Sequence, residues 1–361
     1  MPLSLSMSSP YNNILYVGPD YKNHRGGIGA VLSIYSKTIE PFNFIATNTY
    51  KNKWYEILYF AGSLFRIFFL LLKNREISIV HIHGAKDGSV VRKYCICFIA
   101  KKLFLKKIVF HSHAGAFDEY YKKGNRLYKY MCRFLVNNSD AVVALSDRWN
   151  DFFRENFKIR RIVAIRNPVE HKQPLVLKQK VDSTVTFLFL GRIADHKGIF
   201  DLVDVIVKEQ DSLRGKFKLL VGGNHEVERL KKTITEGGIA DLAEYIGWVQ
   251  DEDKDQYFCQ SDYFILPTYH EAMPMTILEA LSYGKPVIST PVGGIPDVIE
   301  HNRNGYLFPA GDKAKLKQII FDVINDRSKY DCMSTQAMNA AKRFYPESIK
   351  TELEKLYSEI L

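Results

Sequence analysis

The chain has 361 residues, 46% of them hydrophobic and 25% charged, which is long enough for two globular domains with separate cores. The five cysteines include no C-x2-C pair and no cluster with zinc spacing, which argues against structural zinc and favours a reducing compartment. The net charge of +10 is uneven, because residues 1–170 hold 26 Lys and Arg against 12 Asp and Glu, and the remainder holds 24 against 28.

A basic first half predicts an anionic partner, which could be a membrane surface, a nucleic acid or a phosphorylated acceptor. We expect no nucleic-acid partner, because no known binding motif is present and the basic residues alternate with long apolar runs. Residues 1–13 have no basic segment and no long apolar core, so they do not resemble a secretory signal, and we expect a cytoplasmic protein.

The first predicted unit is a strand at residues 11–17, a glycine-rich loop and a helix at residues 30–39. Gly26, Gly27 and Gly29 lie in that loop. Glycines before a helix start let the backbone approach a phosphate closely, although the same residues could form only a tight turn.

Residues 54–72 are strongly apolar, and their length approaches that of a membrane span. Glu56 and Arg66 within the stretch argue against a span. Two interpretations remain, a helix packed on the sheet and an interfacial helix whose ends meet anionic lipid. The flanking basic residues are Lys51, Lys53, Lys73 and Arg75.

Two predicted strands, at residues 77–83 and 106–113, each end in a pair of histidines, with a basic helical pattern at residues 89–105 between them. The pairs are His81 with His83 and His111 with His113. Histidines at alternate strand positions face the same side. A metal site would need a third ligand that the spacing does not name, so we predict hydrogen-bonding histidines and no metal.

Residues 116–124 read as a basic and aromatic loop, and strands are predicted at residues 140–146 and 161–169. The alternation of strands and helices predicts a parallel sheet with right-handed crossovers. The polar residues 171–183 are the predicted interdomain linker.

The second half begins with a strand at residues 184–190 that runs into a loop, Gly191–Gly198. Arg192 and Lys197 lie in this loop, between a strand end and a helix start. A diphosphate would meet two cations there, although the loop could also be a solvated turn. Further strands are predicted at residues 217–223, 245–249 and 263–267.

The last of these strands leads into the most informative stretch, residues 270–297. Glu271 lies in the loop and Glu279 lies eight positions later on the predicted helix, which begins near Met275 and Thr276. In an open α/β sheet, ligands bind outside the carboxyl ends of the strands. Two carboxylates there could accept hydrogen bonds from sugar or ribose hydroxyls, and the helix start could bind a phosphate. Alternatively, Glu271 caps the helix and Glu279 is a solvated position.

This stretch resembles the E-x7-E signature of the retaining glycosyltransferases of family 4, which have the GT-B fold. The likeness extends through Gly284–Val287 and through Gly293 and Gly294, followed by Asp297. It covers nearly the whole chain and is dense from residue 191 to residue 307. It implies an α/β protein with two Rossmann-like parallel-sheet domains facing a central cleft. The implied domains are acceptor binding at 1–173 and nucleotide-sugar binding at 174–343, with a helix at 344–361 crossing back.

The resemblance also implies the site residues. Those implied in catalysis are His113, for which His111 is the second choice, with Glu271, Arg192 and Lys197. Those implied in binding the donor are Gly26, Gly27, Arg192, Lys197, Trp248, Val249, Glu271, Met273, Pro274, Met275, Thr276 and Glu279. Of these, Trp248 and Val249 would hold the base through their backbone, Glu271 the sugar and Glu279 the ribose.

The implied function is the retaining transfer of a hexosyl or N-acetylhexosaminyl group from a nucleotide-diphosphate sugar, most simply a UDP-sugar. No cofactor or metal is expected besides this donor, because fixed cations would meet the diphosphate charge. The expected acceptor is a glycan or a lipid-linked molecule in cell-surface polysaccharide synthesis. The basic first domain is expected to contact the inner face of the cell membrane. The alternatives are a basic nucleic-acid-binding protein and a sugar-nucleotide epimerase or phosphorylase on the same fold.

Overall fold

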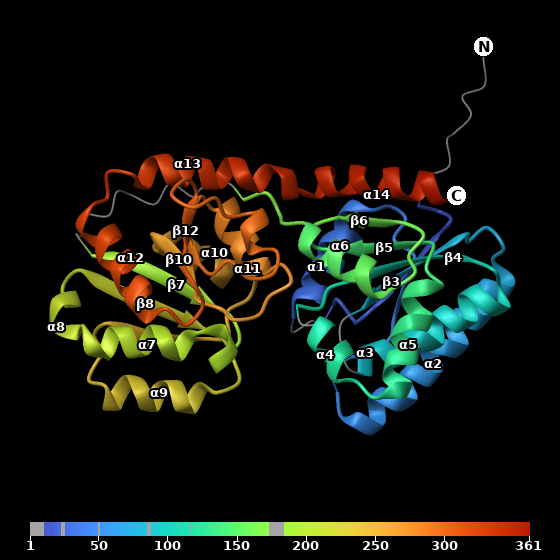
Figure 1. The fold of residues 1–361 in the computed structure, drawn as a ribbon, viewed down its shortest axis with the longest axis horizontal. Helices are drawn as coiled ribbons and strands as arrows, with labels where there is room; N and C mark the ends of the chain where they lie inside the picture. Colours follow the sequence, from blue (N-terminus) through green and yellow to red (C-terminus); the bar gives the residue numbers. More distant parts are fainter. Residues whose placement is uncertain (1–10, 23–25, 50, 85–87, 116, 173–183) are drawn as a thin grey trace, which may run out of the picture. The chain divides into compact units, whose positions relative to one another are not determined.

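The computed structural model describes residues 11–22, 26–49, 51–84, 88–115, 117–172 and 184–361 (Figure 1). The remaining residues lie outside the described part. They include residues 173–183 of the predicted linker and residues 1–10, which belong to the segment that does not resemble a secretory signal. The chain divides into two compact units. Unit 1 comprises Met1–Pro168 and Phe344–Leu361, and unit 2 comprises Val169–Arg343.

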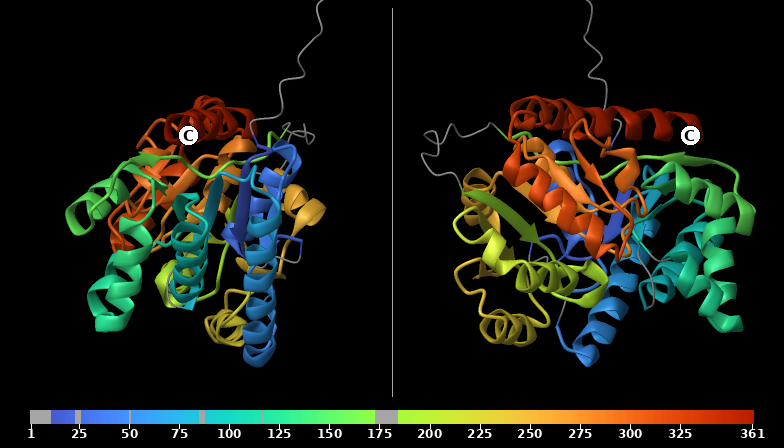
Figure 2. Two further views of the ribbon diagram at one scale, coloured as in Figure 1. Left: turned by 90° about the vertical axis from the view of Figure 1, so that its right-hand side faces the viewer. Right: turned by 60° about the vertical axis from the view of Figure 1, so that its left-hand side comes forward.

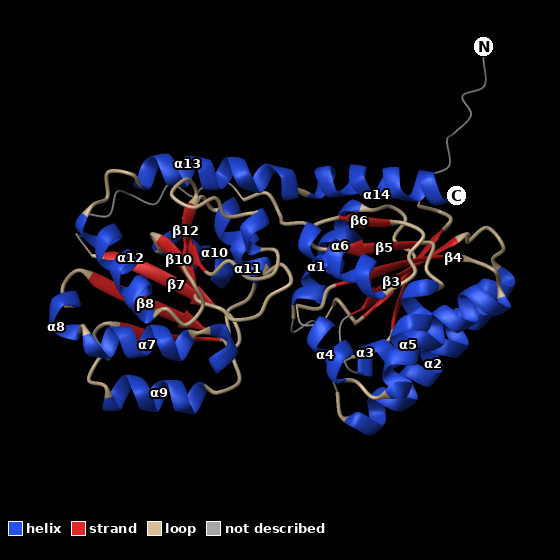
Figure 3. Cartoon of the chain, in the orientation of Figure 1, coloured by secondary structure: helices blue, strands red, loops and turns tan. Residues whose placement is uncertain are grey.

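Unit 1 is built on a six-stranded parallel sheet with the strand order β2-β1-β3-β4-β5-β6 (Figure 3). Its strands are β1 (Ile14–Gly18), β2 (Phe44–Ala46), β3 (Ile79–Gly84), β4 (Lys107–Ser112), β5 (Ala141–Ala144) and β6 (Ile162–Ala164). Its helices are α1 (Gly27–Thr38), α2 (Lys53–Lys73), α3 (Gly88–Phe98), the π-helical turn η1 (Ile99–Leu103), α4 (Phe117–Lys123), α5 (Arg126–Asn137), α6 (Asp147–Asn156) and α14 (Pro346–Ile360).

The two faces of this sheet carry different chemistry, because successive strand side chains point to opposite sides. On one face, Ile82 of β3 and Phe110 of β4 form a core with apolar residues of α2, α3 and α5. These three helices lie side by side in the left view of Figure 2. On the other face, the histidines of β3 and β4 lie beside α1 and α14. One face is therefore an ordinary apolar core and the other a buried polar layer.

Unit 2 is built on a second parallel sheet with the order β12-β11-β10-β7-β8-β9. Its strands are β7 (Val185–Leu190), β8 (Phe217–Gly222), β9 (Ala243–Gly247), β10 (Tyr263–Leu266), β11 (Val287–Ser289) and β12 (Gly305–Leu307). Its helices are η2 (Asp195–Lys197), α7 (Ile199–Lys208), α8 (Gln210–Leu213), α9 (Val227–Glu236), α10 (Asp251–Gln260), α11 (Met275–Ser282), η3 (Ile295–Asp297), α12 (Lys313–Asn325) and α13 (Tyr330–Ala341), and η4 (Lys342–Phe344) leads from α13 toward α14.

The two parallel sheets flanked by helices confirm the predicted α/β class and the GT-B architecture. One local prediction was wrong. The predicted loop at 116–124 contains helix α4. Asp118 and Glu119 lie in its first turn and Lys122 and Lys123 in its last, where their charges interact favourably with the helix dipole. The predicted helix at 89–105 is α3 followed by η1, and it ends at Leu103.

Candidate functional site

The candidate site of unit 2 lies where the strand order of its sheet reverses, between β7 and β10. The loops that follow these two strands are hydrogen-bonded to each other, because the Tyr269 N–H and the Thr268 hydroxyl both donate to the His196 carbonyl, at 2.9 and 3.1 Å. Ligands of open α/β sheets bind at such switch points. The sheet topology therefore brings the predicted diphosphate loop beside the loop of the first glutamate.

Two glycines allow this close approach. Gly198 has a φ of +71°, and a Cβ there would lie 1.9 Å from the Pro267 carbonyl oxygen. Gly293 has a φ of +56°, and its Cβ would lie 1.8 Å from the carbonyl oxygen of Glu271. Any side chain at either position would push the Glu271 loop away, since real Cβ atoms do not approach backbone that closely.

Lys197 and Glu271 form an ion pair across the two loops, and both side chains are largely buried, with 18% and 13% of their surface exposed. The charge of the Lys197 ammonium is therefore balanced by the Glu271 carboxylate in this structure. A ligand phosphate would compete with Glu271 for this lysine, because both are anions that accept from the same ammonium.

Glu279 is also paired, since the Lys254 ammonium of α10 donates to both of its carboxylate oxygens, at 2.9 and 3.1 Å. Lys254 was not identified from the sequence. Each carboxylate oxygen has two lone pairs, so Glu279 can still accept a hydroxyl while it holds this lysine.

The amino end of α11 lies between the two glutamates in the sequence. Pro274 is its N-cap residue, and among the described residues no side chain caps the helix. The alternative in which Glu271 caps the helix is therefore wrong, because its carboxylate contacts Lys197 instead. The first N–H groups of a helix have no intrahelical partner, so those near Met275 and Thr276 can bind an anion.

The other predicted residues of unit 2 are more spread out. Met273, Pro274 and Met275 are buried, whereas Arg192 is exposed in the turn after β7. Trp248, which is 45% exposed, and the buried Val249 follow β9, which is separated from β7 by β8. The structure thus brings Lys197, Glu271 and the start of α11 together, with Trp248 and Val249 beyond β8.

The predicted residues of unit 1 lie near the switch point of its own sheet, between β1 and β3. Gly26 is the N-cap of α1, and a Cβ on it would meet no atom within 4 Å. His113 follows β4, where its N–H donates to the Gly84 carbonyl at 2.8 Å. His111 is fully buried and His113 is partly exposed, so His113 is the histidine of this pair that a ligand could reach.

Behind His113 lies a stack of histidines. His83 Nδ1 and His113 Nε2 are 3.0 Å apart, and His81 Nε2 and His111 Nδ1 are 3.3 Å apart. His81 Nδ1 also lies 2.6 Å from the hydroxyl of Tyr357 on α14. Burial lowers the pKa of His81 and of His113 to about 3, and it lowers those of His83 and His111 well below 6.5. All four imidazoles are therefore neutral near pH 7.

Among the described residues, His81, His83 and His111 form a group that could hold a metal ion, with one nitrogen each within 4.8 Å of the others. The sequence alone did not bring three ligands together, because the third comes from the adjacent strand. The pairing of β3 with β4 places His111 opposite His83. Tyr357 contacts His81 Nδ1 and His113 contacts His83 Nδ1, whereas the buried Nε2 atoms of His83 and His111 have no hydrogen-bond partner among the described residues.

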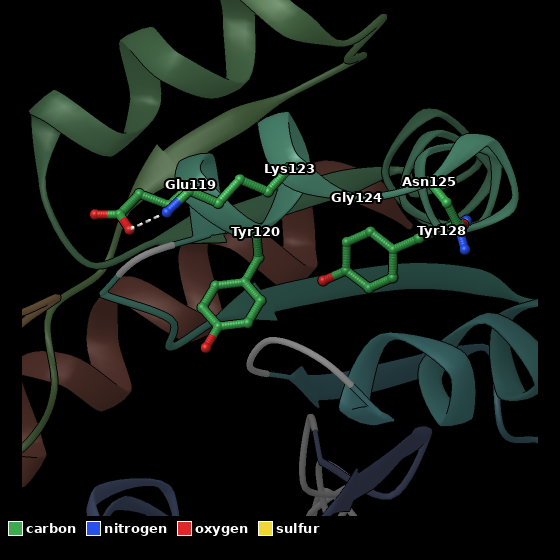
Figure 4. A pocket seen from close by; sticks show the side chains of 6 residues that line it. All are labelled: Glu119, Tyr120, Lys123, Gly124, Asn125 and Tyr128. Atoms are coloured by element: carbon green, nitrogen blue, oxygen red, sulfur yellow. Dashed lines mark hydrogen bonds and ion pairs between the residues drawn. The ribbon is translucent and has the colours of Figure 1, made fainter.

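A separate pocket of about 450 Å³ lies at the junction of α4 and α5 (Figure 4). It is lined by Glu119, Tyr120, Lys123, Gly124, Asn125 and Tyr128. A Cβ at Gly124 would lie 2.4 Å from the Tyr128 ring and 2.9 Å from the Tyr120 carbonyl oxygen. Aromatic rings, an acid, an amine and an amide give this pocket a lining that is both apolar and polar.

Comparison with known proteins divides the chain between two family models. The model of Glycosyltransferase Family 4 matches residues 36–173, and that of Glycosyl transferases group 1 matches residues 177–340. A protein of the cps region of Klebsiella pneumoniae is 26% identical over 276 residues, which cover 72% of this chain and 73% of that one. The lipopolysaccharide 1,6-galactosyltransferase of Escherichia coli is 33% identical over 159 residues, which cover 42% and 43%.

Solved structures agree on the fold. The Anabaena protein HepE, in a complex with UDP, has a TM-score of 0.76 at 18% identity, covering 96% of this chain and all of that one. A sucrose-phosphate synthase from Thermosynechococcus elongatus has a TM-score of 0.77 at 16% identity, covering 96% and 98%. With one family model on each side of residue 175 and a GT-B fold throughout, the chain belongs to the group 1 glycosyltransferases of family 4.

Proposed function

We propose that this glycosyltransferase moves a hexosyl or N-acetylhexosaminyl group from a UDP-sugar to a hydroxyl of a glycan or lipid-linked acceptor, with retention of configuration. The observation that carries the proposal is the amino end of α11, near the switch point of the sheet. Glu271 precedes it in the chain and is paired with Lys197, and Glu279 follows it and is paired with Lys254. The UDP and UDP-glucose complexes of HepE support the choice of donor. The E. coli and Klebsiella relatives support a role in cell-surface polysaccharide synthesis.

In this proposal the donor diphosphate binds at the first N–H groups of α11 and displaces Glu271 from part of its contact with Lys197. Arg192 adds a second cation from the turn after β7. Glu271, once partly released, accepts hydrogen bonds from hydroxyls of the transferred sugar. Glu279 accepts from the ribose while it stays paired with Lys254.

The reaction breaks the bond between the anomeric carbon and the diphosphate oxygen and forms a bond to the acceptor oxygen on the same face. The departing phosphate oxygen accepts the acceptor's proton, so no side chain has to act as a base. Fixed cations and the dipole of α11 stabilise the negative charge that develops on the diphosphate. In this proposal no metal is needed, and the neutral imidazole of His113 contacts the transferred sugar.

The pocket between α4 and α5 supports an acceptor-binding role for unit 1, because its tyrosines and polar groups suit a sugar ring. An epimerase or phosphorylase on the same fold would use the same donor site and release a different product. A nucleic-acid-binding function is not favoured, since the two family models together span most of the chain.

Isothermal titration with UDP-, GDP- and ADP-sugars, each in the presence of a chelator, tests the donor. We expect a UDP-sugar to bind and the chelator to have no effect. Product analysis by NMR with a simple acceptor should then show the donor's anomeric configuration kept. Binding that needs magnesium or manganese, an inverted product, or an epimerised nucleotide sugar would contradict the proposal.

A further inference from the structure

Helix α2 has two apolar faces. Its inner face packs on unit 1, where Ile67 and Leu71 belong to the core and the Ser63 hydroxyl donates to the Ala46 carbonyl at 2.8 Å. A second stripe, which we call the outer face, consists of Trp54, Leu58, Ala61, Phe65, Phe69 and Leu72. Its large side chains are between 51% and 79% exposed.

The outer face is one continuous strip without charge. At about 100° per residue its six positions fall within about 80° of one another, and Ile67 lies on the opposite side. The charged residues lie elsewhere, with Arg66 on a flank and Glu56 accepting hydrogen bonds from the N–H groups of Thr49 and Lys51. A helix face that meets water normally carries polar side chains, so this face is suited to a nonaqueous partner.

By length and composition α2 is also long enough to cross a membrane, yet only 17% of its most apolar window is buried in the protein. A crossing helix would have lipid on all sides. The inner face of α2 instead completes the core of unit 1, through Ile67 and Leu71. The helix can therefore offer lipid only its outer face, which fits a helix lying in the plane of a membrane surface.

The neighbouring helices extend the same surface with basic charge. Helix α3 contacts both α2 and α5. Of the basic residues in α3, η1 and α5, Lys102 of η1 and Arg126 and Arg133 of α5 are exposed, whereas Lys93 of α3 is buried and donates to Thr47. Lys51, Lys53, Lys73 and Arg75 lie exposed at the two ends of α2. Leu103 of η1, which contacts α2, adds an exposed apolar side chain, as does Leu105 shortly after it.

We propose that the outer face of α2 binds the surface of an anionic phospholipid bilayer, with the helix axis in the membrane plane. The apolar strip would enter the interfacial region while the basic residues at its ends contact lipid phosphates. Charge complementarity favours this partner over a second copy of the chain, which would bring the same basic residues at the ends of α2 against one another. The inference goes beyond the proposed sugar transfer and does not depend on it.

Not every lysine near α2 is available to lipid phosphates. Lys101 is paired with Asp140 at 2.5 Å and is only 18% exposed, and Lys106 donates to the Arg75 carbonyl. Phe65 and Phe69 on the outer face are exposed and do not belong to the core cluster of unit 1. The sharpest variant is therefore the double substitution Phe65→Gln/Phe69→Gln, which should leave the fold intact.

Vesicle flotation of the full chain tests this, with phosphatidylcholine vesicles alone and with about a third of phosphatidylglycerol added. We expect binding only to the anionic vesicles, and weaker binding at high salt. The partition coefficient of the Phe65→Gln/Phe69→Gln variant should fall about tenfold or more. The control, Leu361→Gln, changes a similarly exposed apolar residue that directly follows α14, and it should bind like the wild type.

A second readout uses Trp54, which is 79% exposed. Tryptophan emission should shift to the blue when anionic vesicles are added, and Trp54→Phe should abolish the shift. Equal binding by the outer-face variant and the wild type, or no binding at low salt, would overturn the proposal. Concentration-dependent dimerisation without vesicle binding, measured by light scattering, would assign the face to a second copy and overturn it as well. UDP titration without vesicles reports on the donor site separately.

Discussion

The Lys197–Glu271 ion pair makes the two residues competitors as well as partners. In the structure each neutralises the other, so a nucleotide diphosphate has to take Lys197 from Glu271. The same pairing keeps a carboxylate beside the place where the sugar hydroxyls are expected. Substitutions at the two positions should therefore differ in their effect on free UDP, which loses a cation in one case and a competing carboxylate in the other.

We expect Glu271→Gln to leave the affinity for free UDP unchanged or higher, because Lys197 is then available to the diphosphate. The same variant should lose the added affinity of the UDP-sugar over UDP, since an amide accepts fewer hydroxyl bonds. Isothermal titration with both ligands measures this. A loss of UDP affinity equal to the loss of donor affinity would show that Glu271 does not act on the sugar.

We expect Lys197→Ala to weaken UDP binding by roughly 1.5–3 kcal/mol, the range for one charge-assisted hydrogen bond. The variant also leaves the Glu271 carboxylate beside the diphosphate, so Lys197→Ala/Glu271→Gln should recover part of the loss. This double-mutant cycle reports the coupling directly. Lys232→Ala, an exposed lysine of α9, is the matched control and should bind UDP normally. Additive losses in the cycle would show that the pair is not coupled in the bound state.

We expect Glu279→Ala to weaken UDP and the UDP-sugar to the same degree, because the ribose is common to both ligands. Titration of both ligands against this variant and against Glu228→Ala, an exposed glutamate of α9, checks the assignment. If only donor binding changed, Glu279 would belong to the sugar rather than the ribose.

The sequence could place together residues that lie close in the chain, and it missed contacts between residues that lie far apart in it. Glu271, Glu279 and the start of α11 lie within a dozen residues, so the sequence could place them together. Lys254 lies on a separate helix 25 residues before Glu279, and only the packing of α10 brings the two into contact. In the same way Tyr357 lies 276 residues after His81.

At the scale of elements, the histidine-bearing strands β3 and β4 couple the stability of unit 1 to pH. The four histidines have folded pKa values lowered from 6.5, two of them to about 3. At a pH between the folded pKa of a histidine and 6.5, the unfolded chain therefore binds more protons than the folded chain. The free energy of unfolding of unit 1 is therefore highest above about pH 6.5 and falls as the pH is lowered toward 3. Each extra proton bound by the unfolded chain lowers it by about 1.4 kcal/mol per pH unit.

Urea unfolding at pH 7.5, 6.5 and 5.5 measures this loss. Trp149 lies in the core of unit 1, so its fluorescence, in a background carrying Trp54→Phe and Trp248→Phe, reports on that unit. We expect the midpoint to fall steadily below pH 6.5. A midpoint that stays constant down to pH 5.5 would mean that the histidines are protonated in the folded protein.

The strands of both sheets were readable because buried parallel strands form short, continuous apolar runs between polar loops. Helix α4 was not, because seven residues with mixed aromatic and charged side chains carry little periodicity. Helix α2 was recognised as apolar, but a helix that is apolar on two faces looks the same in sequence whether its second face meets protein or another partner. Only the exposure of Trp54 and Leu58 separates these cases.

At the scale of the whole molecule, unit 1 depends on α14, which comes from the far end of the chain. Leu353 and Leu356 of this helix are buried, the Tyr357 hydroxyl donates to Tyr16 at 3.1 Å, and the Tyr11 hydroxyl donates to Glu354 at 2.7 Å. We expect Leu353→Ala to destabilise unit 1 by about 2–5 kcal/mol, the usual cost of such a core cavity.

The same variant should keep its affinity for UDP, since the proposed nucleotide contacts lie in unit 2. Trp149 fluorescence during urea unfolding and UDP titration measure the two effects separately. Loss of UDP binding under conditions where unit 2 remains folded would show that the nucleotide needs unit 1.

The position of α14 also sets an order of events during synthesis. Unit 2 is continuous in sequence, from Val169 to Arg343, and can fold as soon as it leaves the ribosome. The sheet of unit 1 is made first, yet the face that carries His81 and Tyr16 lacks its contacts with Tyr357 until that residue, which follows all of unit 2, has been translated. Domains usually fold from the N-terminus onward during synthesis. In this protein the domain that is translated first is completed last.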